Sequence, residues 1–236
     1  AVTSSTRGGG KDAGGEKIAA VSAQIVQYGS LLENTIMRLR TSGGCSETQL
    51  SFDNGSTATA SYVNNNAPVD KHCHVFNPAG GGGYYLPVST DWLDSAASAY
   101  TPSYGSAIIT SQSRITGAGL ESSGGVGEDL VLIIPYIKKE LCEAINTRLG
   151  NPITLYQNGI AYDLDNANTW WHGAYGSGLV LLLYTTGAFS QPIPSPHPRT
   201  GCFLSGSGSN RPPAGYYYYY RCELRCRQLR DVRKSL

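Results

Sequence analysis

The 236-residue sequence has few charged residues, and their two signs nearly cancel. Lys, Arg, Asp and Glu make up 15% of the chain, whereas soluble domains average about 25%. The formal net charge of +1 gives no electrostatic reason for binding nucleic acid or an acidic membrane. One local basic patch lies near the C-terminus, and we interpret it as a solvated tail: Arg221, Arg225, Arg227, Arg230, Arg233 and Lys234.

Cys-x-x-Cys motifs are absent from the sequence, which removes the usual zinc-knuckle and thioredoxin signatures. Six widely spaced cysteines are nevertheless present, a pattern typical of structural disulfides in exported proteins. They are Cys45, Cys73, Cys142, Cys202, Cys222 and Cys226. His72 and His74 flank Cys73, but a strand would point both imidazoles to one face and the thiol to the other. We therefore favour a disulfide over a metal site there.

Long apolar runs are also missing, because no stretch approaches the roughly 18 residues of a transmembrane helix, and no signal peptide is present. The residues that follow Ala1 are small and polar, as expected for a processed N-terminus. Together with the cysteines, this predicts a protein that is exported to the cell surface or the extracellular space. We expect that a leader or membrane anchor has been removed.

Catalytic motifs form the last group of absences. The sequence contains neither Gly-x-Ser-x-Gly nor a P-loop, and its four histidines have no matching Ser or Cys motif. Two pairs of carboxylates are present. We interpret Glu128 and Asp129 as the entry to a strand, and Glu140 and Glu143 as part of a solvated helix face. We therefore predict a protein that is not an enzyme and has no cofactor, with an exported hydrolase as the weakest alternative.

Two clusters could still bind a ligand. Asp163 and Asp165 begin a segment rich in oxygen-bearing side chains, which is compatible with calcium, although Ala stands at its fifth position and no Glu closes it. An ordinary Asx-rich turn is the alternative. Trp170 and Trp171 could form a sugar-binding platform, but adjacent Trp residues more often pack in a core.

The clearest element of the sequence is a long amphipathic helix. Residues 1–15 are glycine-rich and predict a flexible N-terminal arm, and an apolar stripe of helical period follows over 16–43. Gly29 interrupts this helix at a cost of about 1 kcal/mol relative to Ala, so we expect it to allow close packing. The stripe consists of Ile18, Val21, Ile25, Tyr28, Leu32, Ile36 and Leu39.

Residues 44–236 are predicted to form a strand-rich body with many loops. Leu130–Ile134 predicts a buried strand that ends at the following proline, and Tyr216–Tyr220 predicts a final strand. A second helix is expected at 137–149, with Gly150 as its stop. The predicted fold class is α+β, with a long N-terminal amphipathic helix packed on an antiparallel, loop-rich, disulfide-stapled β body.

This architecture resembles that of bacterial type IV pilins and of the minor pseudopilins of type II secretion. More narrowly, four segments look like those of a group of exported proteins of alphaproteobacteria. The segments are Ser4–Gly10, QIVQYGSLLENTIMRLRTSGGCSETQLSFDN (24–54), APVDKHCHVFNPAGGG (67–82) and KKELCEAINTRLG (138–150). The resemblance implies a pilin-like structural role without catalytic residues. Pilins carry an additional apolar N-terminal segment that embeds in the membrane and then forms the filament core.

The resulting hypothesis is a subunit of an extracellular or cell-surface filament. Its arm and helix stripe would contact other copies of the chain, or other pilins and secretion components, and only a removed segment would have met the membrane. An exported adhesin or carbohydrate-binding module, using Trp170 and Trp171, is the first alternative. A phage structural protein is the second.

The order of the cysteines along the chain suggests their pairing. It joins Cys45 to Cys73 and Cys142 to Cys202, and leaves Cys222 with Cys226. The last pair is spaced i, i+4, which does not suit a disulfide within a regular helix, so an intermolecular bond or free thiols are alternatives for it.

Overall fold

The computed structural model describes residues 9–55, 64–99, 104–113, 129–151, 199–204 and 216–224. Within these residues, four antiparallel strands form one sheet in the order β1-β2-β4-β3, and two α-helices accompany it. The elements are α1 (Gly9–Thr41), β1 (Ile108–Ser113), β2 (Asp129–Ile137), α2 (Lys139–Leu149), β3 (Thr200–Leu204) and β4 (Tyr217–Leu224). Three single-turn 3-10 helices precede β1, at Glu47–Gln49, Thr90–Trp92 and Ser95–Ala97.

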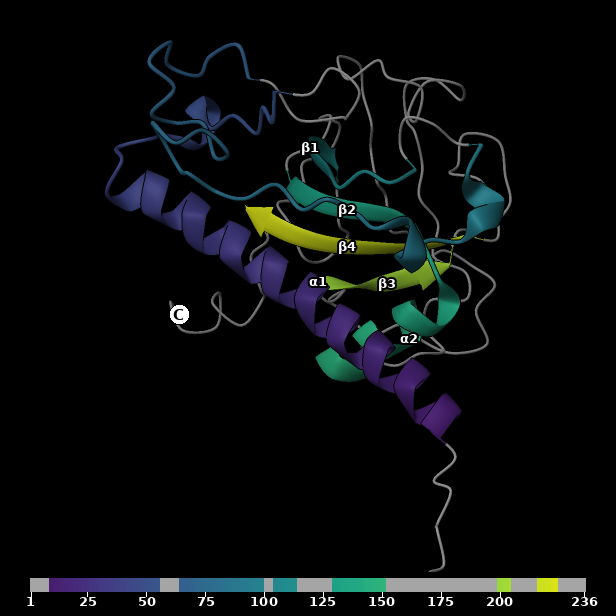
Figure 1. Cartoon of the computed structure of the whole chain (residues 1–236). Helices are drawn as coiled ribbons and strands as arrows, with labels where there is room; N and C mark the ends of the chain where they lie inside the picture. The colour runs from purple at the N-terminus through teal and green to yellow at the C-terminus, as the bar shows by residue number, and fades with distance from the viewer. Residues whose placement is uncertain are drawn as a thin grey trace, which may run out of the picture.

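The long helix α1 crosses one face of the sheet, as Figure 1 shows, and α2 lies beside its N-terminal half. Leu130, Leu132 and Ile134 alternate along β2 and share one core cluster with the apolar stripe of α1. Val131 and Ile133, on the opposite face of β2, are also buried. Burial on both faces explains why this strand is apolar at every position of its middle. The predicted α+β class, a helix packed on an antiparallel sheet, is confirmed.

The start of α1 differs from the prediction, because the helix begins at Gly9 rather than at residue 16. Part of the predicted arm is therefore helical. Helix formation is cooperative, so the packed part of α1 serves as a nucleus, and each further residue needs only propagation. The end agrees with the prediction. Gly44 has a φ of 69°, and the Cys45 N–H donates to the Leu39 carbonyl over 3.1 Å, which closes the last turn.

Strand β2 does not end at the proline, as the sequence suggested, but continues through Pro135 to Ile137. The register with β4 is irregular between Ile134 and Ile137, and Tyr136 has a φ of 60°. A local irregularity of this kind accommodates a proline, which has no N–H for the ladder. The displaced Tyr136 carbonyl instead accepts the Asp94 N–H over 2.8 Å.

Helix α2 matches its prediction closely and is joined to β3 by a polar side chain. It ends at Gly150, which is left-handed with a φ of 70°. Asn146 is buried between the two elements; its amide nitrogen donates to the Cys202 carbonyl over 3.1 Å, and its amide oxygen accepts the Cys202 N–H over 2.8 Å. The side chain thus pairs with the backbone of β3 as another strand would.

Gly29 explains how α1 can lie so close to the sheet. A Cβ atom at this position would stand 2.2 Å from Cδ of Arg221 and 3.3 Å from the hydroxyl of Tyr219. Both residues belong to β4, so the missing side chain of Gly29 provides the space in which β4 meets the helix. The expected close packing at this glycine is confirmed.

We predict that Gly29→Ala destabilises the protein by about 1–3 kcal/mol, because overpacking the contact outweighs the gain in helix propensity. Gly14→Ala is the matched control, since Gly14 is also in α1 and has no atom near the added methyl group. We expect the control to be neutral or stabilised by up to about 1 kcal/mol. Urea denaturation measures both variants, and equal effects would contradict the packing role of Gly29.

Candidate functional site

The inner face of α1 carries the predicted apolar stripe. Ile18 and Val21 are partly buried at its N-terminal end, and the other members are buried in the core: Ile25, Tyr28, Leu32, Ile36 and Leu39. The stripe is therefore used inside the subunit, against its own sheet. A periodic apolar face does not reveal whether it is buried within one chain or between two, and the expected contact of the stripe with neighbouring copies stays a prediction.

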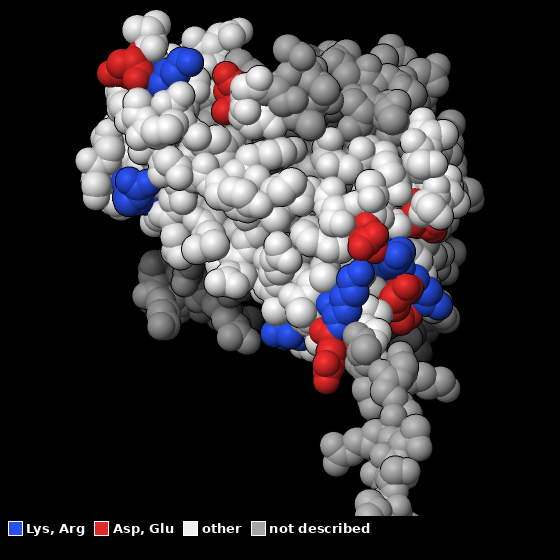
Figure 2. Space-filling model, in the orientation of Figure 1, with Lys and Arg blue, Asp and Glu red and all other residues white. Residues whose placement is uncertain are grey.

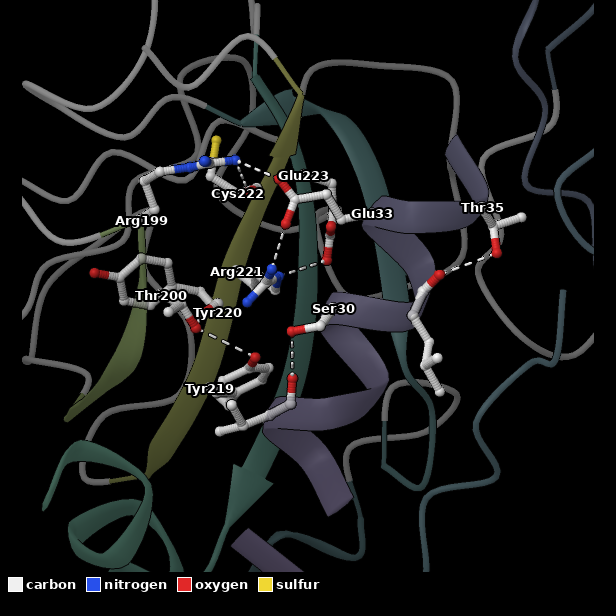
Figure 3. Close-up of polar contacts among 12 residues, drawn as sticks. Ser30, Glu33, Thr35, Arg199, Thr200, Tyr219, Tyr220, Arg221, Cys222 and Glu223 are labelled. Carbon is white, nitrogen blue, oxygen red and sulfur yellow. Dashed lines mark hydrogen bonds and ion pairs between the residues drawn. The ribbon is translucent and has the colours of Figure 1, made fainter. Parts of the chain in front are cut away.

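A charged cluster fastens the same face of α1 to the sheet (Figure 3). Glu33 of α1 accepts a hydrogen bond from Nη2 of Arg199 over 3.2 Å and another from Nη2 of Arg221 over 2.5 Å. Arg221 lies in β4, and Arg199 directly precedes β3. The Arg199 guanidinium also donates to the Cys222 carbonyl over 3.3 Å. One carboxylate of α1 thus receives cations from two neighbouring strands.

Glu223, two residues after Arg221 on the same face of β4, is the most deeply buried member of the cluster. Its side chain is 0% exposed, and its carboxylate lies 3.4 Å from Nε of Arg221. Among the described residues, no donor makes a hydrogen bond to either of its carboxylate oxygens. Burial therefore raises the pKa of Glu223 to about 8, although Arg221 and Arg199 act in the opposite direction and Glu33 adds to the increase.

The position of Arg221 corrects the interpretation of the basic patch as a solvated tail. The Arg221 side chain is only 13% exposed and pairs with two carboxylates. Burial alone would lower its pKa, but Glu223 and Glu33 raise it above the usual value. The other members of the patch lie outside the described residues. Sequence reasoning missed the cluster because its members are far apart in the chain; only the i, i+2 spacing of Arg221 and Glu223 places those two on one strand face.

The outer face of α1 has a different character. From Ala19 to Met37, every exposed position of the helix is uncharged: Ala19, Ala20, Gln24, Gln27, Leu31, Asn34 and Met37. We call these residues the neutral face. Leu31 and Met37 are 56% and 46% exposed. Figure 2 shows the broad surface without Lys, Arg, Asp or Glu in the centre of this view, with the charged residues gathered toward its margins.

A groove of about 330 Å³ adjoins the neutral face. Residues of α1 form one side, with Arg38 as the charged member, and Gly83 and Tyr84 form the other; the α1 residues are Tyr28, Leu31, Leu32, Asn34, Thr35 and Arg38. The Tyr84 ring is itself largely exposed and meets the buried Tyr28 ring edge to face, with the ring centroids 6.4 Å apart. The exposed apolar surface of α1 thus continues sideways onto a neighbouring loop.

The cysteines have three different environments. Cys45 and Cys73 form the predicted disulfide, with their Cα atoms 5.7 Å apart. Cys142 and Cys202 are buried thiols rather than the expected disulfide, although their side chains are in hydrogen-bonding contact. Burial and this contact raise the pKa of the Cys202 thiol well above its usual value. Cys222 is disulfide-bonded, and its partner lies outside the described residues.

The remaining predicted site residues cannot be placed. Asp163, Asp165, Trp170, Trp171 and Cys226 all lie outside the described residues.

The structure corrects one local expectation at the histidines. The segment around Cys73 is a turn in which Lys71 has a φ of 63°, and not a regular strand. The strand argument that separated His72 from Cys73 therefore does not apply. Within the described residues, Cys45, His72 and Cys73 form a group whose potential ligand atoms all lie within 4.8 Å of one another.

Comparisons with known proteins give no relative: no family model, curated protein or solved structure matches the chain. Of the helices that the structure describes, none combines the length and the apolar character needed to cross a membrane.

The raised pKa of Glu223 predicts how stability depends on pH. The folded protein holds the Glu223 proton more tightly than the unfolded chain does, where the pKa is near 4.5. The stabilising contribution is therefore complete below that value and is lost as the pH rises through about 8. We expect the free energy of unfolding of the wild type to fall between about pH 5 and about pH 9 more steeply than that of Glu223→Gln. Glu16→Gln, which changes an exposed carboxylate of α1, should keep the wild-type slope, and an unchanged slope in Glu223→Gln would contradict this role.

The two adjacent thiols predict a disulfide that forms on oxidation. We expect oxidised glutathione to take two electrons and two protons from Cys142 and Cys202, leaving one S–S bond. The bond would close a loop of about 60 residues and stabilise the protein by about 4 kcal/mol in the chain-entropy model. Intact mass should fall by two hydrogen atoms relative to the same chain before treatment, and Cys142→Ser should abolish this change. Both cysteines remaining open to alkylation after oxidation and unfolding would contradict it.

Proposed function

We propose that the protein is a non-enzymatic structural subunit of an extracellular or cell-surface filament, in which α1 contributes the main contact between copies. The observation that carries the proposal is the neutral face. The solvated face of a surface helix normally carries charged residues opposite the buried stripe. Here the stripe is satisfied by the sheet, and the opposite side still lacks charge from Ala19 to Met37.

The character of this surface favours protein as its partner. Centres of protein interfaces are depleted in charged residues and enriched in Met and aromatic side chains. Leu31 and Tyr84 are exposed and line the groove, and Met37 is exposed on the neutral face. A partner that covers them would remove apolar area from water at about 25 cal/mol per Å² before the costs of association.

A second copy of the same chain is compatible with such a face. An uncharged face of this kind requires no complementary charges on the surface of the next copy. The N-terminal turns of α1 extend past the sheet in Figure 1, and Gly14–Lys17 are exposed there. Contact between that end on one copy and the neutral face on the next would be heterologous, and such contacts can propagate into filaments.

The disulfides support the proposed location outside the cell. Cys45 is bonded to Cys73, and Cys222 also has a disulfide partner. Such bonds persist in oxidising compartments and are rare in the reducing cytosol. A phage structural protein would use the same kind of contact between copies and remains the second candidate, whereas the residues of the adhesin hypothesis lie outside the described part of the chain.

The proposal predicts that charge on the neutral face prevents assembly. We expect the wild type to form higher-order species in sedimentation velocity and filaments in electron microscopy, and Leu31→Glu with Met37→Glu to shift the protein toward monomers. Burial of one such side chain contributes about 1.5–3 kcal/mol, so association should weaken at least about tenfold. Val69→Glu is the control, because Val69 is 99% exposed but is not part of α1. A wild type that remains monomeric, or a control that behaves like the double variant, would refute the proposed assembly role.

A further inference from the structure

The sulfur atoms of Cys45 and Cys73 have a histidine beside them. Cys45 follows the end of α1, and Cys73 lies in the turn that also contains His72. The two sulfur atoms and a ring nitrogen of His72 all lie within 4.8 Å of one another. Both cysteines are buried, whereas the His72 side chain is 43% exposed, so the group lies at the rim of the core with one side open to solvent.

The backbone holds the two cysteines in place by contacts other than the S–S bond. Cys45 is fixed by its N–H bond to the Leu39 carbonyl at the end of α1. The Cys73 carbonyl accepts the Ser51 N–H over 3.1 Å, and the Val75 N–H donates to the Ser51 carbonyl over 2.8 Å. None of these contacts involves a sulfur atom, so reduction of the disulfide does not itself break them.

The His72 ring is oriented by a carboxylate. Nδ1 of His72 lies 2.6 Å from Oδ1 of Asp70, and the Asp70 carboxylate also accepts the His72 N–H. A neutral imidazole that donates from Nδ1 to a carboxylate keeps its lone pair on Nε2. This is the arrangement that supports metal-binding histidines in proteins.

We infer that, when the Cys45–Cys73 disulfide is reduced, Cys45, Cys73 and His72 form a binding site for a thiophilic divalent cation of the zinc class. Two thiolates and one imidazole are ligands that zinc prefers, at about 2.3 Å for sulfur and about 2.0 Å for nitrogen. The open side would leave the fourth tetrahedral position to water. The two sulfur atoms either form the disulfide or bind the cation as thiolates, but not both at once. This inference does not depend on filament assembly.

Exchange of the disulfide for a bound cation needs two electrons, with two protons taken up and then released. A phosphine or dithiol reductant supplies two electrons to the disulfide, which takes up two protons and becomes two thiols. The cation then displaces these two protons and binds the two thiolates. Oxidation of the thiolates by a disulfide oxidant re-forms the S–S bond and releases the cation.

Cobalt(II) titration of the full chain, reduced with a phosphine under anaerobic conditions, tests the inference. We expect one Co²⁺ per chain, with thiolate-to-cobalt charge-transfer absorption and the intense visible bands of a tetrahedral site, and displacement by Zn²⁺. The oxidised protein should give neither signal. If the reduced chain needs metal to fold, circular dichroism should report folding together with cation binding.

Variants separate this site from the other thiols of the chain. His72→Gln should weaken Co²⁺ binding about tenfold or more, because it removes a ligand, whereas His74→Gln is the matched control and should bind as the wild type does. Cys73→Ser should remove the charge-transfer band, and Cys142→Ala with Cys202→Ala should retain it. Absence of the band in the reduced wild type, equal affinities of the two histidine variants, or a band that survives in Cys73→Ser would each overturn the inference.

Discussion

The rest of the structure depends on the close approach of α1 to β4 at Gly29 and Glu33. These two residues are one turn apart on the same side of the helix, so a single side chain of β4, Arg221, can meet both. The aliphatic part of Arg221 fills the space that Gly29 leaves, and its guanidinium reaches the carboxylate of Glu33. Removing the Arg221 charge from water is costly unless a carboxylate accompanies it, and Glu33 supplies that carboxylate from the helix. Helix position and strand face therefore determine each other: a shift of β4 by one residue would turn Arg221 and Glu223 away from the helix.

This docking gives α1 two separate tasks. Its inner face packs on the sheet through apolar side chains. In its C-terminal half, Glu33 also forms ion pairs with Arg199 and Arg221. The outer face is consequently free of any need to stabilise the subunit. In an isolated monomer, such a face would ordinarily carry charge for solubility, and its neutrality is therefore the feature on which the proposed assembly role rests. Because contacts of the inner face already hold α1 on the sheet, the residues of the outer face are available for contact with another molecule.

The sequence predicted the elements whose signal is local. The period of the stripe gave α1 and its end, the β-branched run gave β2, and the Tyr run gave β4. The boundaries were less accurate: cooperative propagation extended α1 back to Gly9, and an irregularity carried β2 through Pro135. The candidate site was largely missed, because the partners of Arg221 and the pairing of Asn146 with Cys202 join residues far apart in the chain. The order of the cysteines correctly paired Cys45 with Cys73, but it could not reveal that Cys142 and Cys202 are thiols or that a turn brings His72 to the first pair.

The same helix also explains how a segment with little regular structure is held in place. Residues 64–99 contain only short 3-10 turns and isolated bridges, yet several of them attach to the C-terminal half of α1. The Arg38 guanidinium donates to the Gly81 carbonyl, Tyr84 packs on Tyr28, and the disulfide ties Cys73 to Cys45, four residues after the end of α1. Each attachment uses a different interaction, so none requires the segment to be a helix or a strand. A rigid helix can therefore serve as the support for a loop, and the groove lies beside the neutral face where Gly81 and Tyr84 attach this loop to α1.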